Sequence, residues 1–305
     1  MQRNMILSLI ILLSCSFTSV VGDAFKRCST PVSSQPNIVS TDGGHISNGQ
    51  FVIPAGELLI RITKEKGAWL TVGDNTELVI NGNILLESNG LSSCDIIKVT
   101  GRNVRIHGQG SITGDRLTHK GKNGEWGMGI RLHGAGDVTV NGLTIINCWG
   151  DCIYIGGGSK NVKIDSCVLQ DSRRQGISIT NANDVAISDC RIANINGTKP
   201  GYAIDIEPNK QCVVDNVLIR GVSVVNCEGG LRAILGKKTY GNARIGKVEI
   251  RNCHVMAKSR HTIHFAGCDQ TIVTGCTIET RKGEKPILTR LVGKLTEKNN
   301  KVVYK

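Results

Sequence analysis

The segment Val162-Lys163-Ile164-Asp165-Ser166-Cys167-Val168-Leu169 predicts the fold, because its spacing of apolar residues returns along the chain. Each copy is close to Val-x-Ile-x-x-(Cys/Gly/Leu/Val)-x-(Ile/Leu/Val), and Asn or Asp usually precedes it. Copies start at Val104, Val138, Val162, Val185, Val217 and Val248, with a weaker one at Thr271. The shortest intervals between starts are roughly 23 residues, and the longer ones carry insertions of about 8 to 11 residues. Such a spacing is typical of a solenoid, whose units must stack because none can bury its own apolar face.

Within each copy the apolar residues alternate, skip two positions and alternate again. Alternation indicates a strand, and the skip indicates a bend after which the next strand faces the same core. A further strand precedes each copy, as in Gly129-Ile130-Arg131-Leu132 and Cys152-Ile153-Tyr154-Ile155. Two or three strands per turn of about 23 residues predict an all-β fold. We expect a single right-handed parallel β-helix from about residue 38 to 280, closed by an N-terminal cap.

The segment from Met1 to Gly22 resembles a secretory signal peptide, with Arg3 before an apolar run from Met5 to Leu13 and small residues up to Gly22. The run is too short for a membrane span in the mature protein, and no other stretch qualifies. We expect cleavage near Gly22, which leaves residues 23–280 as the capped β-helix domain. Alternatively, Leu12-Leu13-Ser14-Cys15 approximates a bacterial lipoprotein box and would leave a lipid anchor at Cys15. Both alternatives predict a secreted, periplasmic or cell-surface protein.

Positive charge dominates the chain, with 37 Lys and Arg against 25 Asp and Glu and a net charge of +12. Residues 281–305 hold eight Lys or Arg and two Glu. We expect this segment to be a basic C-terminal tail that closes the last coil and protects it from pairing with other chains. The remaining positive charge favours an acidic polysaccharide as the partner. Nucleic acid is not expected, because no stacking aromatic residues are interleaved with the basic ones.

Twelve cysteines in an exported chain first suggest disulfides, but their spacing argues for free thiols. Four of them share one slot of the repeat: Cys167, Cys190, Cys253 and Cys276. In stacked coils this slot gives an inward column with steps of about 4.8 Å, where thiols behave as small hydrophobic groups. No CxxC pair suggests a zinc site, and we predict neither a metal nor another cofactor.

Aligning the upstream strands gives columns of outward side chains that stack from coil to coil. The residues before the strands are Met128, Asp151, Gln175, Tyr202, Gly229 and His261. The outward residues within them are Arg131, Tyr154, Ser178, Asp205, Arg232 and His264, followed two positions later by His133, Gly156, Thr180 and Glu207. Charged and aromatic groups thus gather on one sheet. We expect a groove there that binds an extended polymer along the solenoid axis.

The segment Gly150-Asp151-Cys152-Ile153-Tyr154-Ile155-Gly156-Gly157-Gly158-Ser159-Lys160-Asn161-Val162 resembles the Gly-Asp-Asp-Cys-Ile-x-Ile…Gly-Ser-x-Asn segment of polygalacturonase-type glycoside hydrolases. Downstream, Gln175-Gly176-Ile177-Ser178-Ile179 is similar to their Gly-His-Gly-Ile-Ser-Ile segment. These enzymes belong to the pectin-lyase-like right-handed β-helix superfamily. The resemblance therefore implies this fold over residues 38 to 280, although the motifs themselves cover only the part from Gly150 to Ile179.

The sequence departs from the polygalacturonase pattern at two positions. Cys152 replaces the second aspartate, Gln175 replaces the histidine, and no clear Arg-x-Lys clamp is found. An orthodox polygalacturonase is therefore not expected. The segment Arg173-Arg174-Gln175-Gly176-Ile177, with Ala203-Ile204-Asp205-Ile206-Glu207-Pro208-Asn209 after it, is more similar to poorly characterised β-helix repeat proteins of the same superfamily.

Two cleavage mechanisms are compatible with the polar columns. In an inverting hydrolase, two carboxyl groups ~6.5–9.5 Å apart act as acid and base. Asp205 and Glu207 lie two positions apart on one strand, ~6.5–7 Å between Cα atoms, and Asp151 is a further catalytic candidate. In a lyase, a base removes the proton next to a uronic carboxylate that cations neutralise. Here the base would be Tyr154, His133 or His264.

The predicted substrate-binding residues are mostly cations on the same face. They are Arg131, Arg173, Arg174, Gln175, Arg232 and Lys238. The insertions from Asn194 to Tyr202 and from Glu228 to Arg244 fall beside the central upstream strands. Long loops on a solenoid often border its binding face, so we expect these two to wall the groove.

Structural roles would explain several of the same residues without catalysis. Asp205 would form a surface ion pair with Arg232 one coil away, Asp151 would cap the turn after Trp149-Gly150, and His261 and His264 would be structural. The leading hypothesis is an exported enzyme that cleaves an acidic glycan by hydrolysis or β-elimination. The alternative is a non-catalytic β-helix module that binds glycans or serves a structural purpose.

Overall fold

The computed structural model describes residues 37–65, 67–236 and 241–305. The expected signal peptide, Cys15, the chain up to residue 36 and Lys238 lie outside these ranges. Within them every regular element is a strand. No helix in the described part of the chain is therefore long and apolar enough to cross a membrane.

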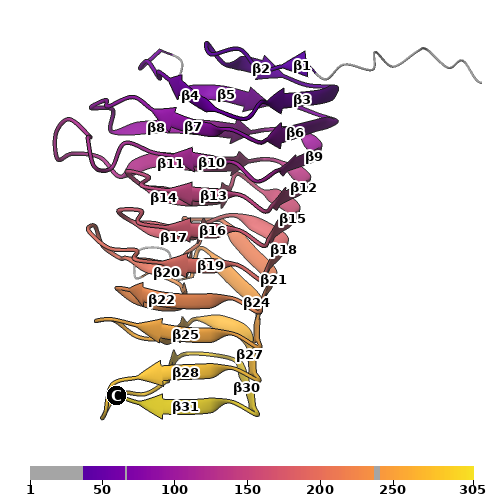
Figure 1. The fold of residues 1–305 in the computed structure, drawn as a ribbon. Coiled ribbons are helices and arrows are strands. Elements are labelled where there is room, and N and C mark those ends of the chain that lie inside the picture. The colour runs from indigo at the N-terminus through magenta and orange to yellow at the C-terminus, as the bar shows by residue number, and fades with distance from the viewer. Residues whose placement is uncertain (1–36, 66, 237–240) are drawn as a thin grey trace, which may run out of the picture. The chain divides into compact units, whose positions relative to one another are not determined.

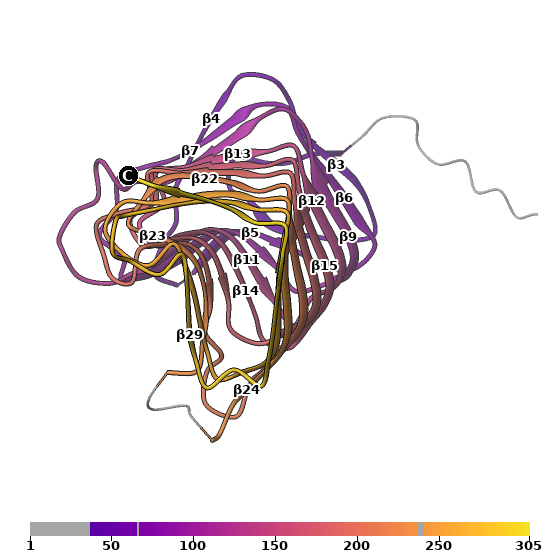
Figure 2. The same cartoon turned by 90° about the horizontal axis from the view of Figure 1, so that it is seen from below.

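Three parallel sheets form the walls of a solenoid, which the chain visits in turn on every coil (Figure 1). Seen along the axis, the walls meet at corners and successive coils lie almost on top of one another (Figure 2). Paired strands come from consecutive coils, as in β12 (Gly136–Asn141), β15 (Ser159–Asp165) and β18 (Ala182–Ser188). The predicted parallel β-helix is confirmed, with three strands per coil.

The strands of each sheet follow the solenoid axis in chain order. The first sheet contains β1 (Asn37–Ile38), β3 (Gly49–Ile53), β6 (Thr76–Ile80), β9 (Arg102–His107), β12 (Gly136–Asn141), β15 (Ser159–Asp165), β18 (Ala182–Ser188), β21 (Val213–Arg220), β24 (Arg244–Arg251), β27 (Cys268–Thr274) and β30 (Lys294–Lys298). The second contains β4 (Glu57–Ile60), β7 (Asn83–Leu86), β10 (Ser111–Thr113), β13 (Thr144–Ile146), β16 (Val168–Gln170), β19 (Arg191–Ala193), β22 (Ser223–Cys227), β25 (His254–Ala257), β28 (Thr277–Thr280) and β31 (Lys301–Tyr304). The third, here called the polar sheet, contains β2 (Gly44–Ile46), β5 (Ala68–Val72), β8 (Ser93–Val99), β11 (Trp126–His133), β14 (Asp151–Gly156), β17 (Gln175–Ile179), β20 (Tyr202–Ile206), β23 (Gly229–Ile234), β26 (Ile263–Ala266) and β29 (Ile287–Arg290).

Short polar residues in a left-handed backbone conformation produce the corners. Asn161, with φ 51°, directly precedes the inward Val162, and Ser166, with φ 52°, fills the two-residue skip before Cys167. Asn, Asp and Ser reach this region at lower cost than β-branched residues do. The Asn161 side chain also donates a hydrogen bond to Asp137 one coil earlier, at 2.7 Å. The Asn or Asp that introduces each repeat therefore has a direct structural cause.

The core is the column of inward side chains that the repeat predicted. Val138, Val162 and Val185 are in register on consecutive coils, and all are at most 1% exposed. Of the ten cysteines that the structure describes, all are free thiols and only Cys212 is not buried. Cys190 Sγ donates to the carbonyl of Ser188, two positions earlier, at 3.2 Å. The thiols thus satisfy their weak donors without pairing.

The β-helix continues past the predicted boundary at residue 280. β29, β30 and β31 add one more strand to each sheet, so residues 281–305 form a coil rather than a separate tail. Leu295 stacks on Thr271 and is 39% exposed, whereas Ile287, paired with Ile263, is 8% exposed. In β30, Glu297 takes the place that Val273 holds one coil earlier. The apolar alternation is interrupted there, so the sequence pattern ends early.

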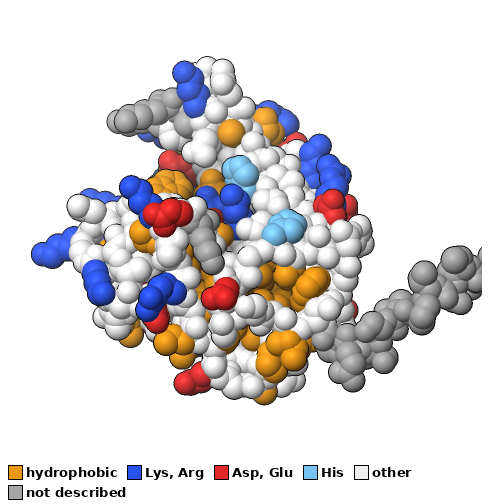
Figure 3. Space-filling model, turned by 90° about the horizontal axis from the view of Figure 1, so that it is seen from above, with side chains coloured by type: hydrophobic (Ala, Val, Ile, Leu, Met, Phe, Trp, Pro, Cys, Tyr) orange, Lys and Arg blue, Asp and Glu red, His pale blue; other side chains and the backbone are white. Residues whose placement is uncertain are grey.

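At the opposite end, hydrophobic side chains are visible among polar ones in the view along the axis (Figure 3). Ile38 in β1 is 73% exposed and Leu59 in β4 is 59% exposed. This is the end that the predicted N-terminal cap was expected to cover.

Long connections flank the polar sheet on both edges. Residues 114–125 join β10 to β11 and residues 194–201 join β19 to β20, before the polar strands. The second predicted insertion, Glu228 to Arg244, needs correction, because β23 lies inside it. β23 ends at Ile234 and β24 begins at Arg244, so the inserted residues come after the polar strand.

Candidate functional site

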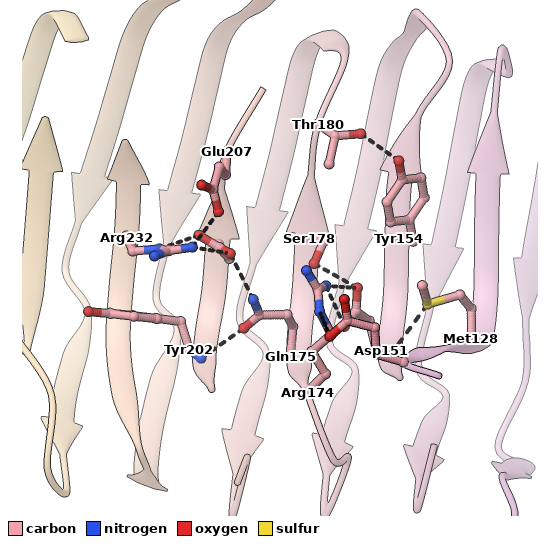
Figure 4. Close-up of polar contacts among 12 residues, drawn as sticks. Met128, Asp151, Tyr154, Arg174, Gln175, Ser178, Thr180, Tyr202, Glu207 and Arg232 are labelled. Atoms are coloured by element: carbon pink, nitrogen blue, oxygen red, sulfur yellow. Dashed lines mark hydrogen bonds and ion pairs between the residues drawn. The ribbon is translucent and has the colours of Figure 1, made fainter. Parts of the chain in front are cut away.

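The outer face of the polar sheet has the register that the sequence predicted. Consecutive pairs of the central column are Arg131–Tyr154, Tyr154–Ser178, Ser178–Asp205, Asp205–Arg232 and Arg232–His264. What the columns did not reveal is which side chains bond to one another. They form separate polar clusters, one around Asp151 and one around Asp205, beside the Tyr154–Thr180 pair (Figure 4).

Asp151 lies at the centre of the first cluster and is 0% exposed. Its carboxylate accepts hydrogen bonds from Arg174 Nη1 at 3.1 and 3.2 Å and from Ser178 Oγ at 2.7 Å. Burial raises the pKa of Asp151, and the Arg174 guanidinium opposes that shift. The side chain points into these partners rather than capping the turn after Gly150. A glycan cannot touch Asp151 in this arrangement.

Asp205 is held from both neighbouring coils. Arg232 Nε and Nη2 donate to its two oxygens at 2.6 and 2.7 Å, and Gln175 Nε2 donates at 2.7 Å. Gln175 is itself 0% exposed, and its carbonyl oxygen accepts from the backbone N–H of Tyr202 at 2.8 Å. The Asp205–Arg232 pair is therefore not a surface ion pair, since the side chains are only 4% and 11% exposed. Gln175 positions Asp205.

Glu207 is the most exposed of the three predicted catalytic carboxylates. Its side chain is 38% exposed and accepts one bond, from Arg232 Nη2 at 2.6 Å. Burial raises the pKa of Glu207, and the nearby Asp205 charge adds to that shift. A carboxyl group that keeps its proton beyond the usual range, within reach of solvent, can act as a general acid.

The two carboxylates are closer than their Cα spacing predicted. Glu207 Oε2 and Asp205 Oδ2 bond the same Nη2 atom, at 2.6 and 2.7 Å, so the distance between these oxygens cannot exceed the sum of the two bonds. Inverting glycosidases keep their carboxyl groups ~6.5–9.5 Å apart and retaining ones ~5–5.5 Å. The shared Arg232 atom therefore holds these two oxygens below the first range, at a separation no longer than the second.

A second polar group lies on the N-terminal half of the sheet. Arg131 Nε donates to both oxygens of Asp95, at 2.7 and 2.8 Å, and the guanidinium stands over the ring of Tyr154, 4.7 Å from its centroid. The Tyr154 hydroxyl pairs with Thr180 at 2.7 Å. A pocket of about 360 Å³ beside Asp95 and Arg131 is also lined by Lys98 and His133. Extending the column alignment one coil upstream would have found Asp95, which pairs with Met128.

Arg173 lies at the edge of the sheet rather than over the carboxylates. Its guanidinium stands 3.8 Å from the Trp149 ring centroid and donates to the carbonyl of Gly124 at 2.8 Å. His119 stacks on the same Trp149, and its Nδ1 lies 2.8 Å from the buried Asp115. Arg173 thus helps to fix the 114–125 connection. Sequence columns could not reveal this cluster, because its loop has no counterpart in other coils.

His264 is the last residue of the predicted column, which continues with Leu288 in β29, and it lies beside His261, with ring centroids 5.0 Å apart. Burial lowers the pKa of His264 to about 4, with smaller contributions from His261 and Arg232. The imidazole is therefore neutral near pH 7. Within the described ranges, no group of three or more His, Cys, Asp or Glu side chains is arranged to hold a metal ion.

Comparison with known proteins places the chain in a family. Residues 81–243 and 128–284 match the family model described as right handed beta helix region, which together is more than half of the chain. The chain belongs to this family.

Two curated relatives come from Bacillus subtilis (strain 168). The SPbeta prophage-derived uncharacterized protein YorA is 29% identical over 53% of this chain and 32% of its own length. The uncharacterized protein YclG is 26% identical over 75% of this chain and 43% of its own length. The matched region is thus less than half of each relative.

Three solved structures share the fold at low identity. PfbA, a surface adhesin of Streptococcus pneumoniae, has a TM-score of 0.63 at 14% identity, covering 90% of this chain and 75% of that one. The tailspike of E. coli bacteriophage HK620, solved with a pentasaccharide, has a TM-score of 0.62 at 14% identity, covering 84% and 51%. The endo-xylogalacturonan hydrolase of Aspergillus tubingensis has a TM-score of 0.57 at 11% identity, covering 84% and 85%.

Proposed function

We propose that this protein binds an extended glycan along the polar sheet and hydrolyses it at Asp205 and Glu207. The observation that carries the proposal is the pairing of these carboxylates through one atom of Arg232, whose Nη2 lies 2.7 Å from the first and 2.6 Å from the second. Glu207 has the exposure and the raised pKa of a proton donor. Export, expected from the N-terminal segment, belongs to the same proposal, because it would bring the protein to extracellular polysaccharide.

The chemistry follows from the positions of the two groups. Glu207 gives its proton to the glycosidic oxygen, which breaks the bond to the leaving sugar. As that bond breaks, an Asp205 oxygen bonds to the anomeric carbon, and the Glu207 carboxylate then takes a proton from the water that cleaves this ester and frees Asp205. Because Asp205 is 3% exposed and bonded by Arg232, this attack requires the Arg232 side chain to move off one of its oxygens. The short separation supports retention of anomeric configuration. The tailspike and the xylogalacturonan hydrolase make a glycan a reasonable ligand class, but a shared fold alone does not transfer an activity.

Substitution of the proton donor tests the proposal directly. Glu207→Gln should lower turnover by ~10²-fold or more, because the amide cannot supply the proton. Release of reducing ends from a panel of polysaccharides measures hydrolysis, and absorbance of an unsaturated product measures β-elimination. Glu77→Gln is the matched control, since Glu77 is 34% exposed and ion-paired but lies on the first sheet. Full activity of the Glu207 variant would remove the hydrolase assignment.

The pH profile provides an independent readout of the same group. Burial and Asp205 raise the pKa of Glu207, so the proton is retained above the usual range for glutamate. Activity should fall as the pH rises through this raised value, because the deprotonated form has no proton to donate. The basic limb of the profile should therefore lie above the range of an exposed glutamate. A limb within that ordinary range would contradict the assignment of Glu207.

Glycan binding without cleavage is a second candidate, and one observation favours it. All three predicted catalytic carboxylates are ion-paired with arginine, and Asp151 and Asp205 are almost fully buried. Buried ion pairs can serve rigidity alone. Specific binding of a polysaccharide, with neither reducing ends nor unsaturated product over a long incubation, would support this candidate over the hydrolase.

A further inference from the structure

A pocket of about 450 Å³ lies on the polar sheet next to the carboxylate pair. Its walls come from β20, β23 and β26 and from the corners before β26 and β29. The lining residues that matter here are Tyr202, Arg232, Arg260, His261, His264 and Arg281. Arg232 belongs to both places, because it lines the pocket and bonds Asp205 and Glu207. A ligand in this pocket would therefore reach the proposed cleavage site.

Arg260 is the unusual residue of this pocket. Arg232 is neutralised by two carboxylates and Arg281 pairs with Glu284, whose carboxylate also lines the pocket. The guanidinium of Arg260 forms no ion pair or hydrogen bond with any described residue. Its Nε atom is buried without a hydrogen-bond partner. An unsatisfied buried donor on a charged group is costly, so such groups normally have a partner.

We propose that this pocket binds the carboxylate of an acidic sugar residue, with Arg260 as its principal ligand. The inference rests on the proposed glycan-binding function and names the substrate class as a glycan that contains uronic acid. A guanidinium offers two parallel N–H donors that match the two oxygens of a carboxylate. One unpaired cation calls for one negative charge, which favours a carboxylate over a doubly charged phosphate.

The other walls suit the rest of a sugar ring. The Tyr202 ring centroid lies 4.8 Å from the Arg232 guanidinium carbon, and this largely buried ring, 4% exposed, closes one wall of the pocket. His264, neutral because burial lowers its pKa to about 4, can exchange hydrogen bonds with hydroxyl groups. Ligand sites commonly combine such surfaces with a few placed polar groups. Because β20 and β26 are two coils apart, the acidic sugar would lie roughly 10 Å or less along the axis from the carboxylate pair.

The test measures binding separately from cleavage. Isothermal titration calorimetry with the Glu207→Gln variant would use tetrasaccharides of galacturonate, glucuronate and mannuronate, each beside its methyl ester. At least one acid should bind more tightly than its ester, and adding Arg260→Ala should weaken that acid at least tenfold while leaving the ester unchanged. Arg260→Lys, which keeps the charge but loses the planar fork, should have an intermediate effect. A sulfated neutral tetrasaccharide that replaces the acid equally well would overturn the choice of carboxylate.

Lys258→Ala is the matched control, because it removes one positive charge from the same corner at an exposed residue outside the pocket. An equal loss of affinity in the Lys258 and Arg260 variants would overturn the proposal, as would equal binding of acid and ester. The two proposals fail separately. Arg260-dependent binding without any cleavage would support the pocket and remove the hydrolase. Cleavage of neutral glycans at a rate that Arg260→Ala does not change would support the hydrolase and overturn the pocket assignment.

Discussion

Arg232 is the single side chain on which the geometry of the candidate site depends. Its Nε and Nη2 atoms hold Asp205, and the same Nη2 holds Glu207. The fork of a guanidinium fixes distances and directions in a way that a lysine ammonium cannot. Asp151 lies in a comparable pair with Arg174 but has no exposed surface. Asp205 is only 3% exposed, so the two aspartates have similar partners and similarly little exposed surface, and what distinguishes Asp205 is that its arginine also bonds the exposed Glu207.

Loss of the Asp151 carboxylate should affect stability more than chemistry. Asp151→Ala leaves the Arg174 guanidinium, 15% exposed, without its buried counter-ion, and we expect a loss of about 3 kcal/mol in unfolding free energy. Urea denaturation measures it. Asp269→Ala is the control, because Asp269 pairs with Arg244 at the surface, where its side chain is 55% exposed, and should cost less than about 1 kcal/mol. Equal stability of the two variants would show that the buried pair contributes nothing special.

Strands and corners repeat from coil to coil, and the cysteines at equivalent positions allow this stacking to be tested by counting free thiols. Cys167 and Cys190 occupy equivalent buried positions on consecutive coils, and both are free. We expect most of the twelve cysteines to react with a thiol reagent after denaturation without reductant. A reduced and denatured sample gives the full count for comparison. One reactive group or none would mean that disulfides join the coils.

The sequence predicted the strands and the register that repeat from coil to coil. Val162 and its equivalents located the first sheet, and the aligned upstream strands correctly placed Asp205 beside Arg232. Periodicity does not encode which rotamer a side chain adopts, so the Gln175 bridge and the shared Arg232 bond could not be predicted. Arg260 was missed because it lies in a corner, outside the aligned columns. The coil of residues 281–305 was missed because Glu297 interrupts its apolar alternation.

For the whole molecule, the net charge of +12 should favour acidic glycans. Their binding should weaken as the ionic strength rises from about 20 to 300 mM, because the Debye length then falls from roughly 20 Å to below about 8 Å. The methyl-esterified form of the same glycan provides the control and should show little dependence on salt. Calorimetry at each ionic strength measures both. Identical salt dependence for the two forms would mean that charge does not select the partner.

The double role of Arg232 also has an evolutionary consequence. Because one guanidinium both lines the ligand pocket and bonds Glu207, any substitution there alters specificity and catalysis in one step. Descendants of this protein could not acquire a new substrate through Arg232 without losing the reaction. Variation in the sugar recognised should instead accumulate at Arg260 and Arg281, on corners outside the aligned strands. Among close homologues we therefore expect an invariant Arg232 bordered by fast-changing positions in the corners next to the sheet.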